Sequence, residues 1–167
     1  MRAHFVSFVT LALASPAFAV THAVLPDTSI QAKVDLAQPG DIVAIFGGTY
    51  PGDVTISKAV RLVEVDGQEV TITGNVTWNN VPNSPPFEGF TVGSAGKGIT
   101  VSNTTGVKLK NIDTRAGSGL TINGNSNVGV IGGYYSQINH DGGTLSSELT
   151  QISGAFTATA NAVRTTM

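Results

Sequence analysis

The sequence predicts an all-β fold, a right-handed parallel β-helix, and two observations carry this prediction. First, residues 98–118 and 119–139 align as two lines with a period of 21 residues, so that Ile99 matches Leu120. Self-similarity of this length is typical of solenoids. Second, each line holds apolar–polar–apolar triplets separated by Gly, Asn and Ser, which is the pattern of strands and turns. One line cannot bury its own apolar face, so the lines are expected to stack, and parallel connections of this kind are right-handed.

The alignment also predicts which side chains point inward. They are the apolar members of the two lines: Ile99, Val101, Val107, Leu109, Leu120, Ile122, Val128 and Val130. The period continues weakly into a third line, where Leu149 is expected to follow Val128 and Phe156 to follow Tyr135. Asp141 would then fall in the column of Leu120, where a buried unpaired carboxylate is costly. We therefore expect residues 140–143 to form a bulging loop.

Residues 1–19 have the features of a secretory signal peptide. A short positive start containing Arg2 precedes an apolar run, and Ala17-Phe18-Ala19 is an A-x-A cleavage site. We expect the mature chain to begin at Val20 and to be secreted, whether extracellular, periplasmic or on the cell surface. No later apolar run is long enough to span a bilayer.

Composition narrows the classes of protein that the mature chain can belong to. Removing Arg2 takes the formal charge from -2 to -3, which argues against nucleic-acid binding because that needs a concentrated basic face. The chain has no cysteine, so an exported form would depend on packing and hydrogen bonds alone. With 20 glycines and only 12% charged residues, it fits one stacked β domain over residues 20–158.

Taken in order, the domain begins with a helix. A capping Asp27 or Thr28, an apolar stripe at Ile30 and Val34, and the stop signal Pro39-Gly40 predict a helix over residues 27–39. It is expected to cap the open first coil. The apolar run 42–46 predicts a strand, and the later triplets predict further strands at 54–56, 60–62, 70–72 and 76–78. A loop over residues 79–86 interrupts the pattern, which returns at 87–92.

Residues 159–167 are predicted to be a tail without a strong pattern. A β-helix end exposes unpaired backbone groups, and residues 153–167 hold few of the charged residues or prolines that blunt an edge. Phe156 is their one large apolar side chain. We expect the C-terminal coil to be uncapped, so that the chain stacks on a partner or on itself, or continues a longer β-helix.

The opening residues resemble the N-terminal cap and first coil of right-handed parallel β-helix proteins of the pectin-lyase-like superfamily. The resemblance rests on Ser29-Ile-Gln-Ala32, Ala37-Gln-Pro-Gly-Asp41, Gly48-Thr-Tyr50 and Val54-Thr-Ile-Ser-Lys58. It implies the fold, whereas members include pectate lyases, polygalacturonases, pectin methylesterases, tailspikes and adhesins, so fold alone does not give the activity. The site motifs of the three enzyme groups have no convincing match. The lyase alternative would imply Ca²⁺, but no acidic cluster supports it, and we predict no cofactor.

Asp113 and Arg115 are the candidate catalytic pair. Two residues apart in an extended segment, they share a face, with Lys108 and Lys110 nearby and Glu88 one line earlier. A carboxylate beside a cation could act on an acidic sugar. A solvated surface ion pair is the favoured interpretation.

Aromatic residues give a candidate carbohydrate site at Tyr134. Neighbours in a strand point to opposite sides, so Tyr135 is expected in the core and Tyr134 outside, where sugar rings could stack on it. An ordinary surface tyrosine remains the alternative, and Trp78 is expected to pack in the core. His140 and Asp141 are too few for a metal site.

Several threonines lie between two apolar residues, on the opposite face of their strands. Thr100 and Thr121 are expected to stack in register. A flat hydroxyl ladder could bind carbohydrate or crystalline surfaces, but threonine is also simply a good exposed strand residue. From these features we expect a secreted β-helix that binds or presents a surface to extracellular polysaccharide without catalysis. A partial polysaccharide lyase or hydrolase and a structural or adhesive module are the alternatives.

Overall fold

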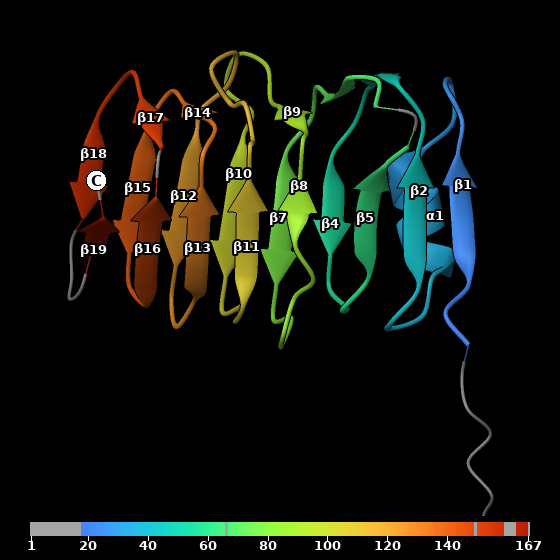
Figure 1. The fold of residues 1–167 in the computed structure, drawn as a ribbon, viewed down its shortest axis with the longest axis horizontal. Coiled ribbons are helices and arrows are strands. Elements are labelled where there is room, and N and C mark those ends of the chain that lie inside the picture. The colour runs from blue at the N-terminus through green and yellow to red at the C-terminus, as the bar shows by residue number, and fades with distance from the viewer. Residues whose placement is uncertain (1–17, 66, 149, 159–162, 167) are drawn as a thin grey trace, which may run out of the picture.

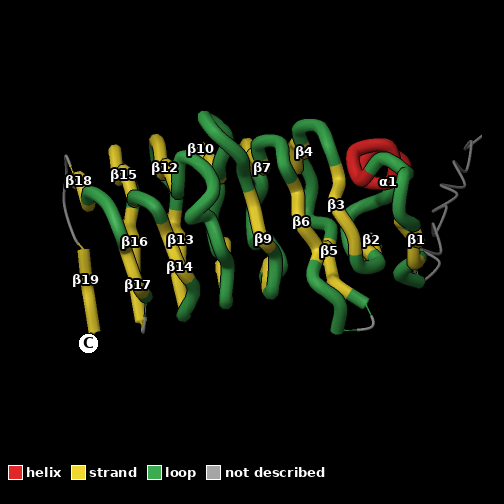
Figure 2. Tube along the Cα trace, turned by 90° about the horizontal axis from the view of Figure 1, so that it is seen from above, coloured by secondary structure: helices red, strands yellow, loops and turns green. Residues whose placement is uncertain are grey.

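Short strands joined by turns run through the chain in the computed structural model, which describes residues 18–65, 67–148, 150–158 and 163–166. Every strand pairing in the described chain is parallel. The strands stack as an all-β parallel solenoid of about six turns, confirming that part of the prediction. Figure 1 shows the turns side by side along the long axis, and Figure 2 shows the same stack from above.

The described strands lie on three faces of the solenoid. The first face contains β1 (Thr21–Val24), β2 (Ile42–Ile45), β5 (Arg61–Glu64), β8 (Phe87–Glu88), β11 (Val107–Lys110), β13 (Asn127–Ile131), β16 (Thr144–Glu148) and β19 (Val163–Thr166). The second face contains β4 (Val54–Ile56), β7 (Val76–Asn79), β10 (Ile99–Ser102), β12 (Leu120–Asn123), β15 (Ile138–Asp141) and β18 (Phe156–Ala158). The third face contains β3 (Gly48–Tyr50), β6 (Val70–Ile72), β9 (Thr91–Val92), β14 (Tyr134–Tyr135) and β17 (Gln151–Ile152).

The core is the apolar interior that the three faces enclose. Ile99 lies directly beside Leu120, and Val107 beside Val128, as the 21-residue period predicts. All eight side chains predicted to point inward are buried. Trp78 is buried as well, with its ring edge-on to Phe87 at a centroid distance of 5.1 Å. Alternation along each strand therefore places one set of side chains inside and the next outside.

The single described helix, α1 (Ile30–Leu36), is shorter than the predicted range 27–39. Its N-cap is Ser29, whose hydroxyl accepts a hydrogen bond from the Ala32 N–H at 3.2 Å. Asp27, one of the two predicted caps, has a positive φ and lies outside the helix. Ile30 and Val34 are buried in the core cluster. The helix lies beside β1, β2 and β4, at one end of the stack (Figure 2).

The third line departs from the predicted register, and two expectations about it are wrong. Ile138 pairs with Leu120, 18 residues earlier, so the coil is shorter than 21 residues. The predicted bulge at residues 140–143 is instead the end of β15, with His140 buried opposite Ile122, followed by a two-glycine turn. Asp141 consequently lies outside the column of Leu120, on the exposed side of the strand.

The shorter coil shifts the later pairs too. Leu145, rather than Leu149, pairs with Val128, and Ile152, rather than Phe156, pairs with Tyr135. Residue 149 itself lies outside the described residues.

Two strands at the ends of the stack were not predicted. β1 precedes the helix and pairs with β2 in parallel. β19 lies within the predicted tail 159–167 and pairs with β16, so the part of this range that the structure describes is strand. β18 and β19 are the outermost strands of their sheets.

Candidate functional site

The third face carries one outward column that crosses six turns. Strand register aligns Thr49 with Thr71, and Thr71 with Thr91. Isolated bridges continue the column from Thr91 to Asp113 and from Asp113 to Tyr134. Tyr134 pairs with Gln151 in the last described turn of this face. Outward side chains from six successive turns are thereby held in one row, about 4.8 Å apart.

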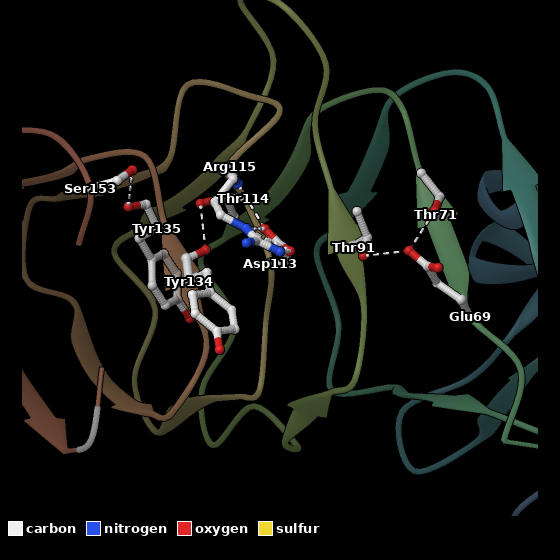
Figure 3. Close-up of polar contacts among 9 residues, drawn as sticks. All are labelled: Glu69, Thr71, Thr91, Asp113, Thr114, Arg115, Tyr134, Tyr135 and Ser153. Atoms are coloured by element: carbon white, nitrogen blue, oxygen red, sulfur yellow. Dashed lines mark hydrogen bonds and ion pairs between the residues drawn. The ribbon is translucent and has the colours of Figure 1, made fainter. Parts of the chain in front are cut away.

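Asp113 and Arg115 form an ion pair in the middle of this column (Figure 3). The Nε of Arg115 donates to both carboxylate oxygens of Asp113, at 3.1 and 3.0 Å, and Nη2 donates to Oδ2. The backbone N–H of Arg115 also donates to Oδ1 at 2.9 Å. A short turn of two residues is sufficient for this arrangement because an aspartate side chain reaches the backbone two residues on.

The ion pair fixes the charge state of both groups. Hydrogen bonds from the Arg115 side chain hold the pKa of Asp113 below its ordinary value, and Asp113 in turn raises the pKa of Arg115. Asp113 is therefore a carboxylate at neutral pH. A group that must donate or collect a proton works best with a pKa near the working pH, and Asp113 is moved away from it.

Tyr134 lies directly against this pair. The Cζ of Arg115 is 4.4 Å from the centre of the Tyr134 ring, a distance typical of a cation–π contact. Tyr134 is 42% exposed, whereas Tyr135 is fully buried, so the predicted in–out assignment of the two tyrosines is confirmed. Burial raises the pKa of the Tyr135 hydroxyl.

A cavity of about 270 Å³ adjoins the two aromatic residues. Its walls are Arg115, Tyr134, Tyr135, Gln151, Ile152 and Ser153. Ser153 closes one side, because its backbone N–H and its hydroxyl both donate to the Tyr135 carbonyl, at 2.9 and 3.3 Å. The hollow thus combines an aromatic face, a guanidinium and an amide side chain.

A second polar group lies further along the same column and was not foreseen. The Oε1 of Glu69 accepts hydrogen bonds from the hydroxyls of Thr91 (3.0 Å) and Thr71 (3.5 Å), as Figure 3 shows. The recurrence of outward residues about every 20 residues from Thr49 to Tyr134 is the sequence signal that could have found this row.

The structure does not bring the other predicted site residues to Asp113. Glu88 lies on the first face, where it pairs with Lys110 at 3.7 Å, and Lys108 belongs to the same strand as Lys110. His140 is buried in β15. Within the described residues, no three histidine, aspartate or glutamate side chains gather as a metal site.

The second face carries a different row. Thr55, Thr77, Thr100 and Thr121 are in register on its outer side, which confirms the expected stacking of the last two. Asn139 and Thr157 continue the row. Asp141 is the only charged residue on the described strands of this face.

The described part of the chain contains no helix with the length and apolarity needed to span a membrane. No family model, no curated protein and no solved structure matches the sequence. The parallel solenoid is therefore established by strand order and register, and the likeness to pectin-lyase-like proteins remains a resemblance of sequence.

Proposed function

We propose that this protein is an exported, right-handed β-helix of the pectin-lyase-like type that binds extracellular polysaccharide through its third face, without catalysis. Right-handed winding is supported by the strong preference of parallel crossovers for that hand. A capping role for α1 is supported by its position beside the first turns and by the burial of Ile30 and Val34. Export is supported by the apolar leader and the A-x-A motif.

The contact of Arg115 with Tyr134 at the rim of the cavity is the observation that carries the binding proposal. A sugar ring has an apolar face of C–H groups and an edge of hydroxyls or, in uronates, a carboxylate. Tyr134 offers the apolar face a partner. Asp113 engages the donors on Nε and Nη2 of Arg115, and the donors on Nη1 could bind sugar oxygens or a carboxylate.

The row in which these residues lie suits a polymer better than a small molecule. Consecutive outward positions from Thr71 to Gln151 provide hydroxyl, carboxylate, aromatic and amide groups in a straight line. A chain of sugars laid along this row would meet one such group at every turn of the solenoid, about every 4.8 Å.

The enzyme alternative is the weaker one on chemical grounds. Glycoside hydrolases need two carboxyl groups flanking one bond, and Glu88, the second carboxylate offered by the sequence, is paired with Lys110 on another face. Asp113 is neutralised by Arg115, which lowers its basicity. The structural or adhesive alternative is favoured by the uncharged threonine row of the second face.

Affinity electrophoresis in gels containing pectin, alginate or a neutral glucan tests the proposal. We expect an acidic polysaccharide to retard the protein and Tyr134→Ala to weaken binding about tenfold, the loss of one aromatic stack worth about 1.4 kcal/mol. Ile131→Ala is the matched control, since Ile131 belongs to the same turn, has a similar exposed fraction (37%) and lies on the first face.

Two outcomes would overturn the proposal. If none of these polysaccharides retards the protein, the binding proposal is wrong, and the adhesive or structural alternative is the one to test next. If new reducing ends or unsaturated uronides appear and are lost in Asp113→Asn, the protein is an enzyme.

A further inference from the structure

A buried carboxylate marks the point at which the chain enters the fold. Asp41 lies between α1 and β2, and its side chain is 8% exposed. One oxygen, Oδ1, accepts a hydrogen bond from the backbone N–H of Val20 at 2.8 Å. The other, Oδ2, accepts from the backbone N–H of Gln38 at 2.7 Å and lies 3.2 Å from Nε2 of His22.

The residue at Oδ1 is the one that the A-x-A motif places first in the mature chain. Val20 is fixed there by a second hydrogen bond, from the Ile42 N–H to the Val20 carbonyl at 2.9 Å. On its other side the chain is accessible, since Phe18 is 85% exposed and Ala19 is exposed as well. The Ala19–Val20 peptide bond therefore lies at the boundary between an accessible segment and the first strand, β1.

We propose that Asp41 is the receptor for a new N-terminus, the α-amino group of Val20 released by cleavage of the Ala19–Val20 bond. Cleavage consumes one water: the Ala19 carbonyl becomes a carboxylate, and the Val20 nitrogen leaves as an amine that takes up a proton. The hydrogen bond to Oδ1 then changes from a neutral amide donor to an ammonium donor. This inference rests on the proposed export, because export supplies the peptidase.

The physical reason lies in the cost of burying a charge. A buried carboxylate is stable only where donors and opposite charge replace water. Gln38 and Val20 lower the pKa of Asp41 by hydrogen bonding, and His22 adds to this. The amide hydrogen bond already has an ionised acceptor, and an ammonium at the same position adds a full positive charge, so that the contact gains the attraction of an ion pair. Processing thus locks β1 against the loop before β2.

Among the described residues, one other titratable side chain contacts the Asp41 carboxylate. His22 of β1 faces Oδ2, whereas Arg61 of β5 donates only its backbone N–H to the Asp41 carbonyl, at 2.9 Å. The new ion pair predicts a pH dependence of the unfolding free energy that substitution of His22 should not remove. Asp41 raises the pKa of the α-amino group above its ordinary value of about 7.7–8.0. The added stability is therefore present below that value and is lost as the pH rises through the folded-state pKa.

The test uses the protein recovered after secretion from a bacterial host, with its first residue read from the intact mass. Its unfolding in urea is followed by the fluorescence of Trp78, from about pH 6 to about pH 10, beside the full chain made without export. We expect the processed protein to begin at Val20 and to lose stability at alkaline pH relative to the full chain. Each unit of raised α-amino pKa should appear as a tenfold change in the unfolding constant.

Two variants and one chemical modification assign the effect. Asp41→Asn in the processed protein, and selective acetylation of the α-amino group of the unaltered processed protein, should each abolish the alkaline loss. His22→Gln should retain it. The acetylated protein keeps Asp41 and so decides the matter even where Asp41→Asn folds poorly.

The two failures are distinguishable. A mass showing cleavage elsewhere, or none, overturns both the predicted processing site and the receptor. A chain that begins at Val20 but has the same alkaline stability as the full chain, or loses it equally after acetylation, overturns the receptor alone and leaves export standing.

Discussion

Replacing Leu120 with alanine tests the stacked core directly. Leu120 is fully buried and lies between Ile99 in the preceding turn and Ile138 in the following one. Backbone hydrogen bonds hold those turns in place, with the Ile99 N–H donating to the Gly119 carbonyl and the Leu120 N–H to the Gln137 carbonyl, both at 2.9 Å. Because the ladder fixes the spacing of the turns, the cavity left by the missing atoms cannot close.

A leucine-to-alanine change in a core costs about 2–5 kcal/mol, and more where the site cannot collapse. We therefore expect Leu120→Ala to lower the free energy of unfolding by about 3–5 kcal/mol and the Tm by about 10 °C. Urea denaturation followed by the single tryptophan, Trp78, measures this. Thr121→Ala is the control, since Thr121 lies in the same strand but faces outward; it should cost less than about 1 kcal/mol.

A double-mutant cycle with Ile138→Ala tests the corrected register of the third line. Contacting residues are expected to couple by about 0.5–3 kcal/mol. If Leu120→Ala costs no more than Thr121→Ala, the inward column is wrong, and if Leu120 and Ile138 show no coupling, the shortened coil is wrong.

Three further predictions follow from single features. Gly119 has φ +78°, and an added Cβ would lie 2.0 Å from a backbone oxygen of the next turn. Gly96 has nearly the same φ, +77°, but open space around it, so Gly96→Ala should cost only the left-handed strain of about 1–2 kcal/mol and Gly119→Ala well over that. Equal losses of stability in thermal melts of the two variants would contradict the close approach. Hydrogen bonds from Arg115 lower the pKa of Asp113, so the stabilisation of the folded protein by the ion pair is present above about pH 3.9 and is lost as the pH falls through the folded-state pKa. Asp113→Asn should therefore reduce the fall in unfolding free energy at acid pH, measured in urea at a series of pH values. An equal fall in both proteins would refute this. Phe156 is 44% exposed on an outermost strand, so the protein should self-associate in light scattering and Phe156→Lys should reduce this, whereas a concentrated wild-type monomer would contradict it.

Local pattern was sufficient for the stacking of the two regular lines. The period of 21 residues aligns Ile99 with Leu120, and strand alternation alone then separates buried from exposed positions, including Tyr135 from Tyr134. The same local chemistry predicted the ion pair, because Asp113 and Arg115 are two residues apart and need no distant partner. These features depend on neighbours in the chain or on an unbroken repeat.

Tertiary structure decided whatever depends on the length of each turn. A coil shortened by three residues moved Ile138 onto Leu120 and turned the expected bulge at residues 140–143 into strand and turn. The contact of Arg115 with Tyr134 and the binding of Val20 at Asp41 each join segments about 20 residues apart. A periodic sequence specifies that neighbouring turns meet, but which side chains meet depends on the residues absorbed by each loop, and only the closed backbone ladder fixes that number.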